Sequence, residues 1–225
     1  MTPGLYVVGT PIGNLNDISA RAIETLKQVN GILAEDTRHT RILLDRFEIK
    51  TPAFSCHKFN EAARIDGILT RLRAGESLAL VSDAGMPGVS DPGSRMVAAC
   101  RKAGIPVICV PGPSSVTAAI SLCGFPGAGF VFAGFTPRKS GALRKFLQEF
   151  ATCPVPVAVF ESPFRLMKLL DEIEATLGGG RELFVGRELT KKFEETVWGG
   201  AAELKRAFQG RTIKGEIVLV IASLR

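Results

Sequence analysis

The sequence predicts an α/β protein built from two α/β domains. Three observations favour this fold class: apolar runs of strand length, amphipathic segments of helix length that alternate with them, and glycine- and proline-rich clusters between the two. Strands that alternate with helices are typical of a mostly parallel sheet covered by helices on both faces. With 225 residues, the chain can bury the core of one large domain or of two compact ones without disulfide bonds.

The first half of the chain begins with a strand, a loop and a helix. An apolar run at residues 5–8 ends in the sequence GTPIGN, and Ser19 then caps a helix whose apolar residues recur on one face. The same periodicities predict the elements that follow. These are a strand at 32–34, helices at 42–47 and 60–74, a strand at 78–81, a helix at 94–102, a strand at 106–110 and a helix that ends near residue 122.

The second half repeats this alternation. It predicts strands at 131–132, 155–160, 183–187 and 217–221, and helices at 143–150, 166–177 and 202–208. The stretch GFPGAG at residues 124–129 is the best candidate for a joint, because it places three glycines and a proline between structured segments. We expect an N-terminal α/β domain over residues 1–116 and a C-terminal α/β domain over residues 117–225.

Composition indicates a reducing aqueous compartment. The five cysteines are scattered without a C-x-x-C pair, which argues against a disulfide framework or a zinc site and favours buried reduced thiols. No basic leader precedes an apolar core, and no apolar run approaches the roughly 20 residues of a membrane span. We therefore expect a cytoplasmic protein that contacts no membrane. The formal net charge of +6 favours an anionic partner.

Ligands of open α/β sheets bind beyond the carboxyl ends of the strands, and three loops in such positions are unusually rich in glycine and proline. The first, GTPIGN at residues 9–14, lacks the spacing of a phosphate-binding or dinucleotide-binding loop, and Pro11 removes an amide donor. From the residues alone, it is equally well a tight turn. In the second, SDAGMPGVSDPG at residues 82–93, Asp83 either accepts hydrogen bonds from a ligand or caps an Asx turn. In the third, PGPSS at residues 111–115, each serine either caps a helix or binds a ligand.

Together with five further motifs, these loops resemble the ribosomal RNA small subunit methyltransferase I family, which belongs to the tetrapyrrole methylase-like superfamily of class III methyltransferases. The motifs occur in the family's order along nearly the whole chain. They are GTPIGN followed by Asp17, AEDTRHT, SDAGMPGVSDPG, PGPSS, GFTPRK, ESPFR, RELTKKFEE and KGE. Members of this family methylate the 2′-oxygen of a cytidine in 16S ribosomal RNA.

The resemblance implies a homodimer of two-domain α/β subunits that holds S-adenosyl-L-methionine in a cleft between the domains, with small-subunit ribosomal RNA, free or assembled, as the partner. Carried over by position, it implies a set of cofactor-binding residues. These are Pro11, Asp83, Met86, Ser114, Ser115, Glu161, Leu189 and Gly215. Related chains often continue past the KGE strand into a further helical segment, where this sequence ends at Arg225.

Methyl transfer to oxygen is an in-line displacement, so alignment is the main task, and a base that accepts the hydroxyl proton assists it. The sequence offers several candidates for the catalytic group, each of which is alternatively a structural ion-pair partner. These are Glu35, Asp36, Glu161, Lys214 and Glu216. No metal-ligand pattern is present, so a metal-free reaction is expected.

A basic stretch over residues 134–148 predicts contacts with RNA phosphates, although a solvated helix face has the same composition. The candidate RNA-binding residues are Arg38, Arg41, Arg138, Lys139, Arg144 and Lys145. Two other functions fit the same fold: methylation of a tetrapyrrole precursor, and RNA binding without catalysis. The AEDTRHT, GFTPRK and RELTKKFEE motifs favour the RNA methyltransferase.

Overall fold

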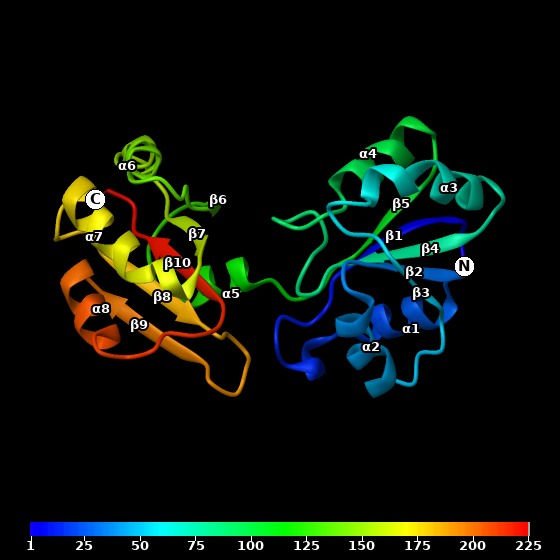
Figure 1. Cartoon of the computed structure of the whole chain (residues 1–225), viewed down its shortest axis with the longest axis horizontal. Helices are drawn as coiled ribbons and strands as arrows, with labels where there is room; N and C mark the ends of the chain where they lie inside the picture. Colours follow the sequence, from blue (N-terminus) through cyan, green and yellow to red (C-terminus); the bar gives the residue numbers. More distant parts are fainter. Residues whose placement is uncertain (225) are drawn as a thin grey trace. The chain divides into compact units, whose positions relative to one another are not determined.

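The structure of the chain, a computed structural model, describes residues 1–224. It contains two compact units, Met1–Ser114 and a second that starts at Ser115, and each has its own five-stranded sheet (Figure 1). The second unit therefore begins with helix α5 (Ser115–Cys123). The GFPGAG stretch lies inside this unit, between α5 and strand β6 (Val131–Phe135), so the expected joint at residues 124–129 is wrong.

The first unit holds a parallel sheet with two helices on each face. Its strands lie in the order β3-β2-β4-β1-β5, and every ladder is parallel. The strands are β1 (Gly4–Val8), β2 (Gly31–Ala34), β3 (Ala53–Ser55), β4 (Ser77–Val81) and β5 (Val107–Val110). The helices are α1 (Ala20–Gln28), α2 (Thr37–Arg46), α3 (Glu61–Arg73) and α4 (Ser94–Lys102). Figure 1 shows α1 and α2 on one side of this sheet and α3 and α4 on the other.

Alternation of side chains along the strands explains this layering. Tyr6 of β1 and Ala79 of β4 belong to the cluster with α1 and α2, whereas their neighbours Leu5 and Leu78 belong to the cluster with α3 and α4. Both faces of the strands are thus apolar, as expected for a buried parallel sheet. The predicted cap is confirmed, because the Ser19 hydroxyl accepts a hydrogen bond from the backbone N–H of Ala22 at the start of α1.

The second unit contains a mixed sheet instead of the expected mostly parallel one. Its order is β6-β7-β10-β8-β9, and only the β6–β7 ladder is parallel. The further strands are β7 (Val157–Glu161), β8 (Leu183–Arg187), β9 (Glu195–Gly199) and β10 (Ile217–Ile221). The sheet is mixed because a short loop turns β8 back into β9, and β10 returns antiparallel between β7 and β8.

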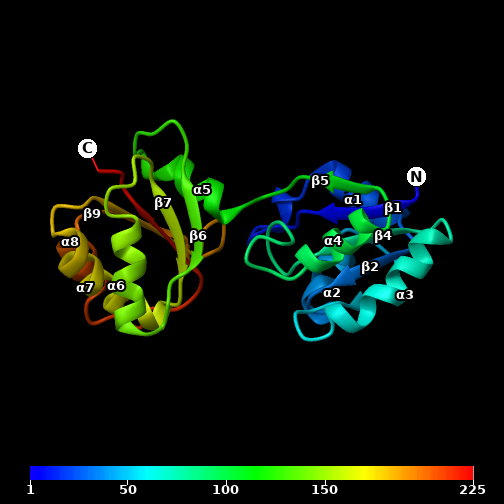
Figure 2. The same cartoon turned by 90° about the horizontal axis from the view of Figure 1, so that it is seen from above.

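Helices cover both faces of this second sheet as well. Three helices pack on one face, around a core that includes Leu147, Leu169 and Phe208. They are α6 (Ser140–Glu149), α7 (Leu166–Leu177) and α8 (Ala201–Phe208). Helix α5 contacts β7, β8 and β10, and Figure 2 shows it on the side of the sheet away from α6.

Two further features concern the composition. No helix among residues 1–224 is both long and apolar enough to span a bilayer. Three of the five cysteines are buried, but Cys109 is exposed and Cys153 is half-buried. The expectation of buried thiols is thus wrong for Cys109, because it lies in β5, an edge strand of the first sheet.

Candidate functional site

The three glycine- and proline-rich loops meet at one edge of the first sheet. They follow β1, β4 and β5, which are neighbours in a parallel sheet, so their carboxyl ends lie side by side. The first two loops are joined directly, because the backbone N–H of Thr10 donates to the carbonyl of Gly85 (2.9 Å) and the N–H of Gly85 donates to the carbonyl of Thr10 (3.1 Å). The Thr10 hydroxyl also donates to the carbonyl of Ser82 at 3.1 Å.

Glycine is required where the first and third loops touch. A Cβ atom on Gly112 would lie 2.7 Å from the carbonyl oxygen of Gly9, and one on Gly9 would lie 2.7 Å from the backbone N of Gly112 and 2.6 Å from Sδ of Met86. Gly85 has φ +77°, a left-handed conformation that favours glycine. The loops that carry the predicted residues Pro11, Asp83, Met86 and Ser114 are therefore held together by bare backbone.

Two carboxylates extend this edge across the neighbouring strand β2. The backbone N–H of Asp36, just after β2, donates to Oδ1 of Asp83, just after β4, at 3.1 Å. Burial, followed by the charge of Asp83, raises the pKa of Glu35, and a backbone hydrogen bond from Asp83 and the charge of His57 only partly offset this. Glu35 is half-buried, so it is a carboxyl group that ionises above its ordinary range.

Asp36 has a different environment. Its carboxylate caps α2 by accepting the backbone N–H of Arg38 at 2.8 Å, and it pairs with the Arg38 guanidinium at 2.7 Å. Hydrogen bonds from the Arg38 side chain and backbone hold the pKa of Asp36 far below its ordinary value. Asp36 thus has a structural role in this arrangement, whereas Glu35 has no such ion pair among residues 1–224.

The second unit presents a comparable edge. Register places four strand-terminal residues in one row across the sheet, namely Glu161, Ile217, Arg187 and Glu195. The segments 162–165, 188–194 and 214–216 adjoin this row, and segment 136–139 follows β6 beside it. The predicted residues Glu161, Leu189 and Gly215 therefore lie along a single edge of the second sheet.

Glu161 sits in a closed polar network. Its carboxylate accepts a hydrogen bond from the Thr136 hydroxyl and another from the backbone N–H of Ser162 (2.7 Å), and it pairs with Arg165 at 3.2 Å. Arg165 also donates to the carbonyl of Pro137 at 2.7 Å, so it ties the segment after β6 to the segment after β7. Glu161 is 3% exposed, and these three partners occupy most of the roughly four acceptor sites of its carboxylate.

The KGE turn is locked to the loop after β8. Glu188 has φ +52° and Gly215 has φ +92°, and a Cβ atom on Gly215 would overlap the Glu188 side chain. Glu188 Oε1 accepts the backbone N–H of Glu216 at 2.9 Å, and the Lys191 ammonium bridges Glu188 and Glu216 at 3.0 Å each. Burial raises the pKa of Glu188, but the bonds from Glu216 and Lys191 outweigh it and leave the pKa below its ordinary value.

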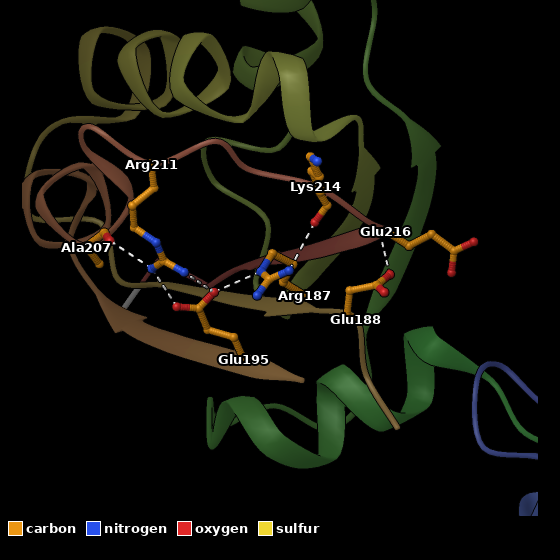
Figure 3. A network of polar contacts seen from close by, with 7 residues as sticks. All are labelled: Arg187, Glu188, Glu195, Ala207, Arg211, Lys214 and Glu216. Carbon is orange, nitrogen blue, oxygen red and sulfur yellow. Dashed lines mark hydrogen bonds and ion pairs between the residues drawn. The ribbon is translucent and has the colours of Figure 1, made fainter. Parts of the chain in front are cut away.

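A second network lies beside this turn (Figure 3). Glu195 pairs with Arg187 at 2.8 Å and with Arg211 at 2.7 Å, and Arg187 also donates to the carbonyl of Lys214 at 3.1 Å. The same carboxylate therefore pairs with both arginines, and these three side chains together keep one net positive charge. Lys214 contributes its carbonyl oxygen to the network, while its side chain remains exposed.

The comparisons with known proteins agree on the family to which these two units belong. Residues 4–205 match the family model described as Tetrapyrrole (Corrin/Porphyrin) Methylases. Proteins named ribosomal RNA small subunit methyltransferase I are 46% identical in Synechocystis (97% of this chain, 78% of the relative) and 44% identical in Thermotoga maritima (97% of each). A relative of that name from Escherichia coli O157:H7 is 42% identical over 96% of this chain and 77% of its own length.

The chain belongs to the ribosomal RNA small subunit methyltransferase I family. Solved structures of more distant proteins share its fold. A cobalt precorrin-4 methyltransferase has a TM-score of 0.72 at 18% identity, covering 97% of this chain and 94% of its own. A Thermus thermophilus uroporphyrin-III C-methyltransferase complexed with S-adenosyl homocysteine has a TM-score of 0.67 at 20% identity, covering 96% of each chain. The predicted fold class, two α/β units of the tetrapyrrole methylase type, is confirmed.

In this methyltransferase, the predicted RNA-binding cations fall into two groups. Three are engaged by carboxylates: Arg38 by Asp36, Arg41 by Asp45 and Arg144 by Glu172, each at 2.7 Å. Three are exposed and form no ion pair with any residue among 1–224, namely Arg138, Lys139 and Lys145. The second group is the better suited to bind phosphates, because its charges are not already neutralised.

Several residues of this site were missed by sequence reasoning. His57 follows β3, a strand that was not predicted, and its charge acts on Glu35. Thr136, Glu188 and Lys191 lie inside the motifs that carry the resemblance, but nothing in those motifs distinguishes them from their neighbours. Within residues 1–224, no group of three or more histidine, cysteine, aspartate or glutamate side chains is arranged to hold a metal ion.

Proposed function

We propose that the protein transfers a methyl group from S-adenosyl-L-methionine to the ribose 2′-oxygen of a cytidine in 16S ribosomal RNA of the small subunit. The observation that carries this proposal is identity of 42–46% with ribosomal RNA small subunit methyltransferases over nearly the whole chain. The loops of each sheet support it. In each unit they place backbone, carboxylate and apolar groups at the ends of strands, where ligands of such sheets bind.

The residues present fit the methyl donor. The glycine contact between Gly9 and Gly112 leaves backbone without side chains at the edge of the first sheet, and Asp83 offers a carboxylate that accepts hydrogen bonds from hydroxyl groups. Leu189 provides an apolar surface in the second unit. In this proposal the donor is held by Pro11, Asp83, Met86, Ser114, Ser115, Glu161, Leu189 and Gly215. S-Adenosyl-L-methionine, when bound, supplies an electrophilic methyl group.

Glu35 is the proposed base for the ribose hydroxyl. Asp36, Glu161 and Glu216 are each engaged in ion pairs, which favour their charged forms and make them weaker proton acceptors than Glu35. Burial and the charge of Asp83 raise the pKa of Glu35 towards neutrality, where a carboxylate accepts a proton more readily. In this proposal Glu35 accepts the proton of the 2′-hydroxyl. Lys214 contributes to the binding of RNA and takes no part in proton transfer.

The RNA partner is proposed to contact the exposed cations Arg138, Lys139 and Lys145, and we propose a cytoplasmic homodimer that contacts no membrane, as the family resemblance implies. Leu122 and Trp198 are large apolar side chains that remain exposed in one copy of the second unit, and Phe125, three residues after Leu122, contacts the Trp198 ring at 6.4 Å between centroids, which supports association with a second copy. Light scattering tests the dimer: a mass of twice 24.1 kDa is expected, and a monomer at all concentrations would remove this part of the proposal.

The function is tested by offering the protein and tritium-labelled S-adenosyl-L-methionine three acceptors: small ribosomal subunits, free 16S ribosomal RNA and uroporphyrinogen III. We expect label in the RNA of the first acceptor, the second, or both, and none in the tetrapyrrole. Label in uroporphyrinogen III alone would favour the tetrapyrrole methylase. Calorimetric titration with the donor checks the remaining alternative, since an RNA-binding protein without catalysis would bind RNA but not the donor.

A further inference from the structure

Four segments lie along one edge of the second sheet, at the ends of its strands, and the proposed methyl transfer does not account for all of their side chains. They are residues 136–139 after β6, 162–165 after β7, 188–194 between β8 and β9, and 214–216 before β10. Pairing of Glu161, Arg187 and Glu195 with their neighbours in one row places the last three segments along the same edge, and Phe135 at the end of β6 pairs with Phe160 next to that row.

In these segments, one set of cations is fixed by carboxylates. Arg165 pairs with Glu161, and Lys191 pairs with Glu188 and Glu216. Figure 3 shows Arg187 and Arg211 converging on Glu195 in the same way. Four cations thus face the four acidic side chains Glu161, Glu188, Glu195 and Glu216, and their charges cancel as a group. The segments are therefore anchored to the sheet, and Glu194, whose carboxylate accepts the backbone N–H of Thr190, is the acidic side chain within them that forms no ion pair among residues 1–224.

The residues next to the anchored cations are aromatic and exposed. Phe164 adjoins Arg165 and is 88% exposed, and Phe193, two residues after Lys191, is 65% exposed. Phe135 at the same edge is 62% exposed, although its ring contacts Phe160 at 5.3 Å between centroids. Phenylalanine is usually buried, and exposed aromatic side chains gathered at one place mark a binding surface.

A second set of cations lies in the same segments. Arg138, Lys139, Lys192 and Lys214 are exposed, and none of them forms an ion pair with a carboxylate of residues 1–224. The Lys192 ammonium lies 5.5 Å from the centre of the Phe193 ring, where it contacts the ring face. The edge therefore combines aromatic faces with positive charges that have no carboxylate partner in the described chain.

We propose that this edge binds unpaired nucleotides of single-stranded RNA, with bases stacked on Phe164 and Phe193 and phosphates on Arg138, Lys139, Lys192 and Lys214. Every base has a face that stacks on an aromatic ring, and phosphates require cations. A duplex fits less well, because its base faces are already stacked on one another. The proposal deepens the proposed function, on which it rests, by naming where the RNA around the modified ribose is held.

The test uses fluorescence anisotropy with a short labelled single-stranded RNA of mixed sequence, and with the same strand annealed to its complement. Phe164→Ala and Phe193→Ala should each weaken binding of the single strand roughly 5- to 150-fold, and they should leave the weaker duplex binding unchanged. Phe164→Trp should retain binding, because it keeps an aromatic face. Phe130→Ala is the matched control, since Phe130 is 40% exposed but lies before β6, at the opposite end of this strand from Phe135. It should bind as the wild type does.

The salt dependence checks the phosphate contacts. Lys192→Gln combined with Lys214→Gln should lower the slope of log affinity against log salt concentration by about 1 to 2, one counterion per lost contact. Circular dichroism and thermal melting confirm that each variant folds.

Wild-type affinity in Phe164→Ala and Phe193→Ala would overturn the proposal, as would equal loss in Phe130→Ala. Conversion of a dimer into a monomer by the two variants would overturn it too, because the edge would then be a protein interface. Methylation of small subunits by the wild-type protein is measured separately, so failure of this proposal is distinguishable from failure of the proposed function.

Discussion

Replacement of Gly112 by alanine tests the contact that joins the loops of the first unit. The new Cβ atom would lie 2.7 Å from the oxygen, 2.8 Å from the carbonyl carbon and 2.8 Å from Cα of Gly9, so every close neighbour is backbone. No side-chain rotation relieves such an overlap, and the first and third loops must separate. Overpacking of this kind costs about 1–3 kcal/mol of unfolding free energy. If the same strain opposes the arrangement of the loops that binds S-adenosyl-L-methionine, donor binding should weaken roughly 5- to 150-fold, since about 1.4 kcal/mol is tenfold.

Urea unfolding followed by circular dichroism and calorimetric titration with the donor measure the two effects. Gly67→Ala is the control in the same unit, because Gly67 lies inside α3 and nothing lies within 4 Å of a Cβ atom built there. Alanine in an exposed helix should stabilise this unit by about 0.5–1 kcal/mol and leave donor binding unchanged. Wild-type stability and donor affinity in Gly112→Ala would refute the account of a backbone contact that shapes the site.

Three further substitutions have defined outcomes. Glu35→Gln should lower kcat without changing donor affinity, and wild-type activity should rise with pH through the raised pKa of Glu35. Because the folded state holds this proton more tightly than the unfolded state, the wild type loses stability as pH rises above the ordinary carboxyl pKa. The variant should therefore be the more stable of the two at neutral pH in urea unfolding. Glu61→Ala removes the buried carboxylate that accepts the N–H of Met96 (3.0 Å) at the start of α4, and should cost about 1–3 kcal/mol in the same assay, whereas Glu61→Gln should retain most of this stability. Lys191→Met leaves Glu188 and Glu216 without their shared cation and should weaken donor binding, with Lys191→Arg partly retaining it; unchanged affinity in both would show that the KGE turn holds its shape without the bridge.

Much of the fold followed from periodicity. The bounds expected for α4, α7, β8 and β10 agree with the structure, because these elements have strong apolar patterns and clear turn residues at their ends. The strands β3 and β9 were missed, since both are edge strands in which some side chains remain exposed, and β3 has only three residues. The direction of β10 was also beyond sequence reasoning, because it depends on how the chain returns after α8.

The site was predictable to the level of loops but not of side-chain partners. Residues after parallel strands gather at one edge whatever their identity, which is why Gly9, Asp83 and Gly112 were found together. The bond from Met96 to Glu61 joins residues 35 positions apart, and that between Asp36 and Asp83 joins residues 47 apart. Such pairs depend on the packed structure, so the sequence left Glu35 and Asp36 as equal candidates until their environments were known.

Nucleoside analysis of the product tests most directly the assignment of sugar methylation. Small ribosomal subunits incubated with the protein and S-adenosyl-L-methionine are digested to nucleosides, which are separated and weighed by mass spectrometry. The predicted product is 2′-O-methylcytidine, with the additional mass on the ribose fragment, and less of it should form with Gly112→Ala at limiting donor concentration. A methyl group found on a base, or the absence of any methylated nucleoside although the donor binds, would contradict it.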